Sequence, residues 1–572
     1  MIYKIEDVFS PRSFPGNTYV SRKLNEYETI DAKFKKALAM KGNLIFVVGA
    51  SKSGKTVLCH SAIPKDNIIN LSGSHIGTRK DFWDHIAEQI PLSDEVAVSN
   101  AISRTDSMGT EDGVNVGINL FGVSAGASIG SNNLVTNNSQ SQVIATNFRT
   151  ERQITKYLID NNYIEEFKKN IADVKLREMF EKTFFNTLYT TTFFEEDGSV
   201  FIITGDIPAM WLRDSSAQVM QYLFFAKKCP SVQALIKGVL KKQFSYILLD
   251  PYANAFNREA NGNGHIYDLD RQSPWVWERK FELDSLCYPL YLLIRYYQVT
   301  KDKSCMDGLF LQAFDKIIEV FKTEQRHKEK SSYYHKAFNQ DERLWCGHGT
   351  PVSNGGLVWS GYRPSDDKCT YGYYLPGNMF IVSVLTKLAP IFSDVLGDLE
   401  RGQRCERLAS EIQAELEKLA VVEVEGKKVY ALETDGLGNY NLMDDANIPN
   451  LLAMPYYEYP YIDEEIYLNT RKLMLSLDNP YYFEGKVLKG IGSPHTPKNR
   501  VWPLSLIIQA LTSKDDDEIE ECIRMIVNST GGTGYIHESV DKDDDTVYSR
   551  AWFAWANSLF AYLILERNAK FL

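Results

Sequence analysis

Residues 205–215 gather several side chains that could bind a polar ligand. The stretch Gly-Asp-Ile-Pro-Ala-Met-Trp-Leu-Arg-Asp-Ser holds, in order, Asp206, Trp211, Arg213 and Asp214. Asp214 or Ser215 is a favourable N-cap for the apolar, helically spaced residues that follow. Polar side chains in a loop at the start of a helix can face a ligand. An Arg–Asp ion pair that only fastens the loop explains the same residues equally well.

Carboxyl groups that could act as an acid and a base occur farther along the chain. Asp366 and Asp367 follow Arg-Pro-Ser in an aromatic loop, and Glu538 follows a glycine-rich segment at 531–534. Glycoside hydrolysis needs one carboxyl group to protonate the departing oxygen and, in an inverting enzyme, a second one to activate water. The aspartates fit the acid and Glu538 fits the base. An exposed turn for the aspartates and a capping role for Glu538 are the alternatives.

Helices must position these loops. From Thr150 onward, apolar residues recur at helical spacing, and loops rich in Gly, Pro, Asn and Asp separate the helical stretches. A β-hairpin is expected at 421–432. About a dozen helices with functional loops suit either an (α/α)6 toroid or a solenoid. Helices are predicted at 151–193, 215–227, 231–248, 282–299, 306–323, 378–393, 399–419, 463–476, 502–512, 517–528 and 549–566.

Four motifs in the same order resemble those of glycoside hydrolase family 125, the exo-α-1,6-mannosidases. The first is the stretch at 205–215, and the others are Trp277–Pro289, Ser360–Asp367 and Gly534–Ser539. The resemblance covers roughly residues 149–572. It implies that this part is a mainly α domain, an (α/α)6 toroid with an inner and an outer helix ring. It also implies inverting, metal-independent hydrolysis of terminal α-mannosides.

The resemblance further implies roles for individual residues. Asp366 matches the acid of the Arg-Pro-Ser-Asp-Asp motif, with Asp367 as the second choice, and Glu538 matches the base. Other motif residues have side chains that can hold vicinal sugar hydroxyls, although each could form a structural salt bridge instead. His265 and His348 are expected near the mouth of the site. The candidates for substrate binding are Asp206, Trp211, Arg213, Asp214, Glu278, Arg279, Asp284, Arg363, His495 and Arg550.

Residues 1–96 carry a separate signal, the pattern of a nucleotide-binding P-loop. A buried strand is expected at 43–48, directly before Gly-Ala-Ser-Lys-Ser-Gly-Lys-Thr at 49–56. In that context backbone N–H groups hold phosphates, and the lysine and threonine reach the outer phosphates and Mg²⁺. No strand ending in an acid for Mg²⁺ is evident before residue 150. We predict a partial α/β segment, followed by a Gly/Ser/Asn-rich linker at 97–148, that could bind ATP and Mg²⁺ through Gly49, Gly54, Lys55 and Thr56.

Composition limits the class of protein. The 572 residues carry a net charge of −11 without a basic stripe, which argues against nucleic acid and fits a neutral substrate. The family resemblance implies that this substrate is a mannose-containing oligosaccharide or N-glycan fragment. Eight scattered cysteines, no signal peptide and no apolar run of membrane-spanning length favour a cytoplasmic protein away from the membrane. No His/Asp/Glu spacing resembles a metal site.

The sequence therefore favours an exo-acting α-1,6-mannosidase that needs no cofactor for hydrolysis. A P-loop signalling protein whose helical domain only binds a glycan or partner is the alternative from another class. A third hypothesis keeps the toroid and changes the substrate to another α-mannoside or an α-glucoside.

Overall fold

The computed structural model describes residues 163–265, 273–337 and 342–568, together with 119–120, 123–124, 154–155 and 157–158. The chain divides into two units, Met1–Gln140 and Ser141–Leu572. In the first unit the described residues form one antiparallel pair of short strands, β1 (Asn119–Leu120) and β2 (Val123–Ser124). The predicted P-loop segment 1–96, with Gly49, Gly54, Lys55 and Thr56, lies outside the described residues.

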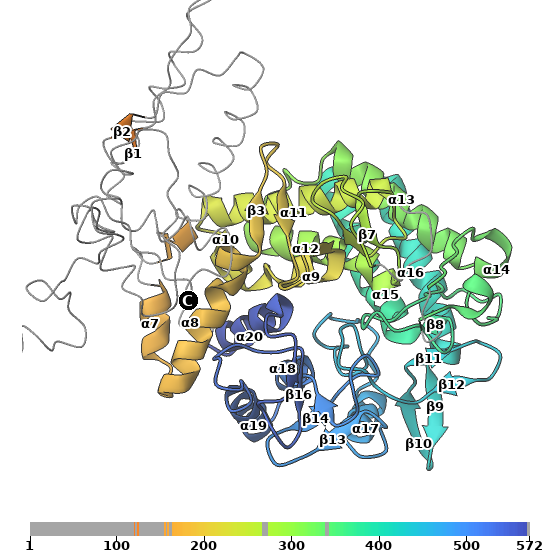
Figure 1. Cartoon of the computed structure of the whole chain (residues 1–572). Coiled ribbons are helices and arrows are strands. Elements are labelled where there is room, and N and C mark those ends of the chain that lie inside the picture. Colours follow the sequence, from red (N-terminus) through yellow and green to blue (C-terminus); the bar gives the residue numbers. More distant parts are fainter. Residues whose placement is uncertain are drawn as a thin grey trace, which may run out of the picture. The chain divides into compact units, whose positions relative to one another are not determined.

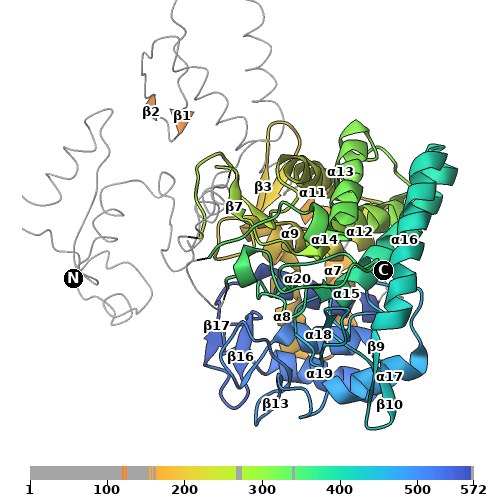
Figure 2. The ribbon, with the colours of Figure 1, turned by 90° about the vertical axis from the view of Figure 1, so that its right-hand side faces the viewer.

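The inner helices of the second unit are buried around most of their circumference, as expected for core helices. Contacts run from α9 through α12 to α15, and from α18 through α20 back to α9 (Figures 1 and 2). Residues 448–459 lie beside α12 and α15 in this ring, since Tyr288 and Ser383 donate hydrogen bonds to the carbonyls of Ile448 and Tyr457. The inner helices are α9 (Leu212–Ala217) with α10 (Leu223–Ala226), α12 (Leu283–Thr300), α15 (Leu375–Pro390), α18 (Pro503–Thr512) and α20 (Ala554–Arg567).

The outer helices are amphipathic and pack on the inner ones. α8 packs on α20, α11 on α12, α16 on α15 and α19 on α18. Buried residues form one stripe on α13 and α16, which is the pattern of a helix with one solvated face. The arrangement is the predicted (α/α)6 toroid. The outer helices are α8 (Val174–Thr190), α11 (Pro230–Leu249), α13 (Gly308–Glu324), α16 (Leu399–Leu419), α17 (Glu464–Met474) and α19 (Asp516–Val527), with short helices α7 (Tyr163–Lys169), α14 (His327–Lys330), η2 (Met220–Tyr222), η3 (Trp345–Gly347) and η4 (Ile391–Leu396).

Short antiparallel strands fasten the loops between the helices. Three-stranded sheets join β5 (Met210–Trp211), β6 (Ala255–Phe256) and β7 (Val276–Glu278); β8 (Tyr373–Tyr374), β11 (Glu433–Thr434) and β12 (Tyr440–Asn441); and β15 (Arg500–Val501), β16 (Ser539–Asp541) and β17 (Tyr548–Ser549). The predicted hairpin at 421–432 is confirmed as β9 (Val421–Val424) and β10 (Lys427–Tyr430). The remaining pairs are β3 (Thr192–Phe194) with β4 (Val200–Ile202), and β13 (Tyr482–Glu484) with β14 (Lys489–Ile491).

Helix boundaries differ from the prediction where strands or caps intervene. The predicted N-cap at Asp214 or Ser215 is wrong, because β5 leads directly into α9 and Trp211 occupies the cap position. The predicted helix 549–566 begins only at Ala554, since residues 548–549 pair as β17. The predicted helix 151–193 is interrupted before α8, where the Asp173 side chain accepts a hydrogen bond from the Leu176 N–H.

The stretch Leu375–Leu396, α15 with η4, is long and apolar enough to cross a membrane by length and composition. This finding corrects the expectation that no such run exists. Most of the apolar window is buried inside the second unit. An inner-ring helix is apolar on all sides because other helices surround it, so its position in the core accounts for its composition.

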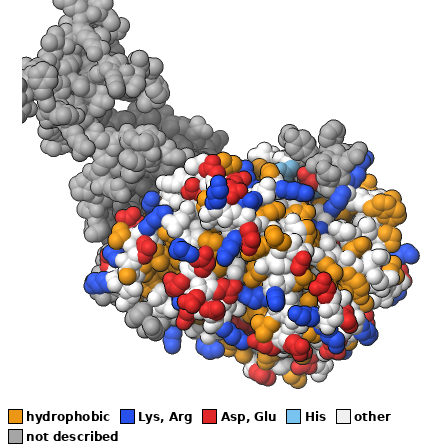
Figure 3. Space-filling model, turned by 90° about the horizontal axis from the view of Figure 1, so that it is seen from below, with side chains coloured by type: hydrophobic (Ala, Val, Ile, Leu, Met, Phe, Trp, Pro, Cys, Tyr) orange, Lys and Arg blue, Asp and Glu red, His pale blue; other side chains and the backbone are white. Residues whose placement is uncertain are grey.

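On the face of the molecule seen in Figure 3, the charges fit a neutral ligand better than a polyanion. On the face seen in Figure 3, acidic and basic side chains of the described residues are interspersed rather than gathered by sign. Exposed helix faces carry pairs three residues apart, such as Lys316 with Glu319 at 2.6 Å and Lys418 with Glu415 at 2.7 Å. Such pairs add only about 0.3–0.5 kcal/mol each.

Gly205 lies where the first motif meets the segment before α20, and its backbone has φ 133°. A Cβ atom there would lie 2.3 Å from the Trp552 carbonyl oxygen, which also accepts a hydrogen bond from the Asp206 N–H. We predict that Gly205→Ala lowers the free energy of unfolding by about 1–3 kcal/mol, measured by urea denaturation. Gly308→Ala is the matched control, because a Cβ there meets open space. Equal losses in both variants would contradict the prediction.

Candidate active site

A pocket of about 240 Å³ lies at the N-terminal ends of the inner helices. Arg213 and Asp214 lie in the first turn of α9, and Trp502 and Phe553 directly precede α18 and α20. Backbone N–H groups at helix starts carry partial positive charge, so this end of the ring favours acidic side chains. The lining residues are Thr204, Ile207, Trp211, Arg213, Asp214, His265, Glu278, Lys280, Glu342, Pro364, Ser365, Asp366, Asn447, His495, Trp502, Glu538, Arg550, Phe553 and Trp555.

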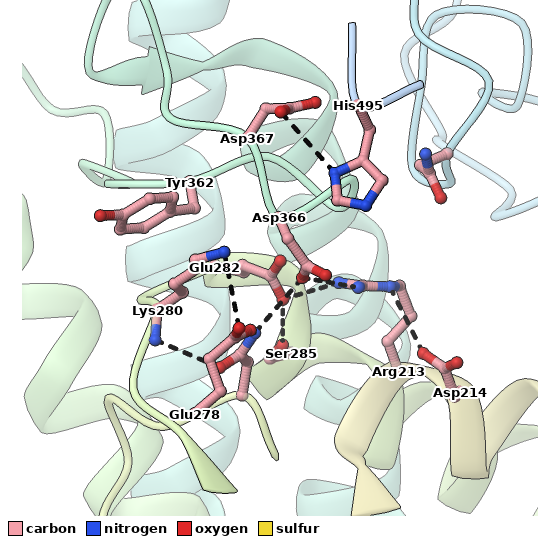
Figure 4. Close-up of polar contacts among 12 residues, drawn as sticks. Arg213, Asp214, Glu278, Lys280, Glu282, Ser285, Tyr362, Asp366, Asp367 and His495 are labelled. Atoms are coloured by element: carbon pink, nitrogen blue, oxygen red, sulfur yellow. Dashed lines mark hydrogen bonds and ion pairs between the residues drawn. The ribbon is translucent and has the colours of Figure 1, made fainter. Parts of the chain in front are cut away.

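Arg213 is the centre of a buried ionic cluster at this pocket (Figure 4). Its Nη1 lies 2.7 Å from Glu282 Oε2 and 3.2 Å from Asp284 Oδ2. Its Nη2 lies 3.7 Å from Asp366 Oδ1, and its Nε lies 3.9 Å from Asp214 Oδ2. Burial opposes the charge of Arg213, but the carboxylates around it raise its pKa well above the usual value. One permanent cation therefore orients four carboxyl groups.

The carboxyl groups outnumber this cation, and burial favours their protonated forms. Burial raises the pKa of Glu282 well above its usual value despite Arg213, and the charge of Asp366 raises it further. Burial likewise raises the pKa of Asp284 to about 6, with Arg213 acting in the opposite direction. The pKa of Asp214 is also raised by burial. The cluster therefore favours the protonated form of Glu282 beside its charged neighbours.

A tight turn presents Asp366 to the pocket. Its backbone lies in the left-handed region, with φ 67°, and its N–H donates to the Arg363 carbonyl at 3.0 Å. The N–H of Arg363 donates in return to the Asp367 carbonyl at 2.8 Å. The guanidinium of Arg363 is buried and pairs with Glu433. Arg363 thus holds the turn from the core side and lies outside the pocket lining.

Glu538 enters the pocket from the loop before β16. Ser549 Oγ on β17 donates to its Oε2 at 2.9 Å, and Arg550 Nη1 lies 3.6 Å from its Oε1. Arg550 Nε also donates to Asp206 Oδ1 at 2.8 Å. The carboxylate of Glu538 is thereby fixed in orientation, and Asp206 contributes by holding Arg550.

His495 adds a further cation to the pocket. Its Nδ1 lies 3.7 Å from Asp367 Oδ1 (Figure 4). Burial alone would lower the pKa of His495, but the interaction with Asp367 outweighs this effect and raises the pKa to about 9. The pKa of Asp367 is lowered correspondingly, mainly because His495 opposes the effect of burial. Asp367 therefore serves as the counter-ion of His495.

Glu278 on β7 is a buried carboxylate held by two basic side chains. His265 Nε2 and Lys280 Nζ lie 3.1 and 3.5 Å from its Oε2, and Asn254 Nδ2 donates to its Oε1 at 2.6 Å. Burial raises the pKa of Glu278, but Lys280 and His265 outweigh burial and hold it below the usual range. The hydrogen bond to Glu278 raises the pKa of His265. This side of the pocket thus offers both donors and acceptors to sugar hydroxyls.

The predicted site residues fall into three groups. Those in the pocket lining are Asp366, Glu538, Trp211, Arg213, Asp214, Glu278, His495 and Arg550. Asp206 and Asp367 lie outside the lining, but each pairs with a lining residue, Asp206 with Arg550 and Asp367 with His495. Asp284 is buried against Arg213, Arg363 pairs with Glu433, and Arg279 donates to Asp250 Oδ2 at 2.7 Å. Of the two histidines expected at the mouth, His265 lines the pocket, whereas His348 bonds to the Tyr333 carbonyl.

Several residues in the pocket lining or directly beside it were not singled out from the sequence. Lys280 and Glu282 belong to the second motif. Because they are charged residues within that motif, they could have been identified from the sequence. Asn447 lies in a polar stretch, and Trp555 follows Arg550 closely in the chain. Trp502 and Phe553 precede helices and had no distinguishing signal. Among the residues that the structure describes, no group of three or more His, Cys, Asp or Glu side chains could hold a metal ion.

Comparison with known proteins identifies relatives over most of the second unit. Residues 173–565 match the model of the family described as metal-independent alpha-mannosidase (GH125). The Meiotically up-regulated gene 157 protein of Schizosaccharomyces pombe (strain 972) is 39% identical over 432 residues, which cover 70% of this chain and 84% of that protein. A solved Streptococcus pneumoniae structure from work on metal-independent alpha mannosidases, a non-productive complex with alpha-1,6-mannobiose, is 41% identical with a TM-score of 0.70, covering 71% of this chain and 97% of that one. These matches favour a glycosidase over the nucleotide-driven alternative.

The His495–Asp367 pair predicts a pH-dependent contribution to stability. Because the pKa of His495 is higher in the folded state than the unfolded value of 6.5, the stabilisation is fully present below about pH 6.5 and is lost as the pH rises toward 9. We expect His495→Gln to flatten this part of the pH profile of the free energy of unfolding, measured by urea denaturation at pH 6 and pH 9. The control is His348→Gln, which removes an exposed histidine that bonds to the Tyr333 carbonyl. An unchanged pH profile in His495→Gln would refute the assignment.

Proposed function

Because the chain belongs to glycoside hydrolase family 125, the metal-independent α-mannosidases, we propose that it removes terminal mannose from α-1,6-linked mannosides by a single inverting displacement. Asp366 is the general acid and Glu538 the general base in this proposal. The substrate class is a mannose-containing oligosaccharide or N-glycan fragment. The mannobiose bound in the Streptococcus pneumoniae relative supports the linkage.

The observation that carries the proposal is that two carboxyl groups from different sides of the ring line the same small pocket. Asp366 precedes α15, which follows α9 and α12 in the inner layer. Glu538 lies between α19 and α20, and α20 contacts α9 from the other side. A sugar between them would have one carboxyl group on each side. An inverting displacement needs this arrangement, because the water attacks opposite to the leaving oxygen.

Asp366 is suited to give up a proton and then carry charge. Its side chain is about a quarter exposed, at 24%, so it can reach a glycosidic oxygen. When its proton moves to that oxygen as the C1–O bond breaks, a carboxylate remains. Arg213 Nη2 lies 3.7 Å from Asp366 Oδ1 and Asn254 Nδ2 lies 3.5 Å from the same atom. Both groups stabilise the negative charge that develops.

Glu538 is suited to take a proton from water. Ser549 and Arg550 contact both of its oxygen atoms and hold the carboxylate plane in place. Their hydrogen-bonding groups are donors, so a lone pair of Glu538 remains free to accept the proton that water loses as its oxygen attacks C1.

The pocket suits one terminal sugar unit. Its volume of about 240 Å³ lies below the roughly 300–1,000 Å³ of sites for larger ligands. Aromatic side chains form its walls, and charged groups lie against two of them: Arg213 faces the Trp555 ring at 5.6 Å and Arg550 faces the Phe553 ring at 4.7 Å. Flat aromatic faces next to hydrogen-bonding groups match a pyranose, which has both apolar faces and polar edges.

Removal of the acid and of the base should have different consequences. We expect Asp366→Ala to reduce kcat/KM severely for α-1,6-mannobiose, but much less for an aryl α-mannoside whose phenolate leaves without protonation. Glu538→Ala should slow both substrates by roughly 10²–10⁴-fold, because neither reacts without an activated nucleophile. Azide should partly restore the aryl mannoside reaction in Glu538→Ala.

Asp367→Ala is the matched control for the acid, since it removes the neighbouring carboxyl group and the counter-ion of His495. Its effect should be similar for both substrates. A leaving-group dependence in Asp367→Ala rather than in Asp366→Ala would assign the acid to Asp367.

The stereochemistry gives an independent test. An attack from the face opposite to the leaving group releases β-mannose first from an α-linkage. We expect the β-anomeric proton of mannose to appear before the α signal in an NMR time course with wild-type protein. Initial α-mannose would indicate a covalent, retaining mechanism and would overturn both role assignments.

A further inference from the structure

Glu282 is a buried carboxyl group next to the proposed acid that the mechanism above does not use. Its side chain is 1% exposed. Its Oε2 accepts hydrogen bonds from Arg213 Nη1 at 2.7 Å and Ser285 Oγ at 3.1 Å. Its Oε1 is buried, and no donor among the described residues reaches it. The carboxyl groups of Glu282 and Asp366 face each other beside Arg213 (Figure 4).

These contacts favour protonated carboxyl groups over two facing carboxylates. Two facing carboxylates repel each other, and a buried oxygen atom without a donor is costly. The charged and titratable groups that face Glu282 are Arg213 from α9, Asp284 from α12, and Asp366 and Cys369 from the loop before α15. With Asp366 protonated before the reaction, Arg213 is shared by Glu282 and Asp284, and one cation cannot neutralise two carboxylates. Burial raises the pKa of Glu282 accordingly.

We propose that Glu282 is a positioning residue for the acid, a neutral carboxyl group that donates a hydrogen bond to Asp366 throughout the reaction. The inference rests on the proposed function, in which Asp366 protonates the leaving group. In the step itself, the proton of Asp366 moves to the glycosidic oxygen, the C1–O bond breaks, and water attacks C1 while its proton moves to Glu538. Glu282 keeps its own proton.

The hydrogen bond assists catalysis because it strengthens as Asp366 becomes charged. A donor bonds more tightly to a carboxylate than to a neutral carboxylic acid. An interaction that is stronger in the transition state than in the ground state lowers the barrier. Arg213 Nη2 and Asn254 Nδ2 lie 3.7 and 3.5 Å from Asp366 Oδ1, so neither makes a short hydrogen bond to it. In the proposal, the Glu282 carboxyl group adds a further donor beside the acid.

The test compares variants on α-1,6-mannobiose and an aryl α-mannoside. Glu282→Gln retains a neutral donor, and we expect its kcat/KM on both substrates to stay within about tenfold of wild type. Glu282→Ala removes the donor, so it should lose roughly 10- to 100-fold on mannobiose and clearly less on the aryl mannoside. Asp284→Asn is the matched control. It contacts the same Arg213 Nη1, and it should affect both substrates alike.

A spectroscopic readout is independent of activity and decides the question if Glu282→Ala fails to fold. The infrared difference spectrum between wild type and Glu282→Gln at pH 7 should contain the carbonyl band of a protonated carboxylic acid. A carboxylate band in its place would overturn the proposal, as would a Glu282→Gln variant that loses as much activity on mannobiose as Glu282→Ala. Failure of the proposed function can be distinguished from failure of the Glu282 proposal. If the proposed function were wrong, Asp366→Ala itself would show no leaving-group dependence.

Discussion

The positive charge of Arg213 inside the helical ring is the constraint on which the site depends. A guanidinium that is 3% exposed must be paired with carboxylates, because burying it alone would be very unfavourable. The partners come from three different parts of the chain: Asp214 beside it on α9, Glu282 and Asp284 at the start of α12, and Asp366 before α15. The same ion pairs therefore determine both how the inner helices pack and where the acid lies.

The toroid allows Arg213 to pair with carboxyl groups from distant parts of the chain, because it brings the N-termini of the inner helices together. Inner helices begin at the pocket, so loops from distant motifs converge there. Small sheets fix those loops: β5–β6–β7 carries Trp211 and Glu278, and β15–β16–β17 borders Glu538 and Arg550. The bridge between Gly205 and Phe553 joins the first motif to the last inner helix. A rigid scaffold of this kind holds carboxyl groups at fixed distances, as catalysis by positioned acids and bases requires.

Sequence periodicity located the helices well, since 3.6-residue spacing is a local property. It failed at α9, where strand pairing of Met210–Trp211 with β6 carries the chain straight into the helix. The motifs also named most of the residues that line the pocket. They could not separate Arg213 and Arg550, which reach the pocket, from Arg279 and Arg363, which pair with Asp250 and Glu433 away from it. All four are arginines in or near similar motifs, and only their remote partners distinguish them.

The sequence by itself determined which carboxyl, basic and aromatic groups are present, on which loops they lie, and which family's motifs they form. Those are properties of residues close together in the chain. The tertiary structure alone decided the directions of the pKa shifts and the division of roles. The pKa of Glu282 is raised and the pKa of Glu278 is lowered, although both are buried carboxyl groups of one motif. Glu278 faces Lys280 and His265, whereas Glu282 shares Arg213 with other acids. Desolvation and charge–charge interactions depend on distances in space, and the order of residues in the chain does not contain them.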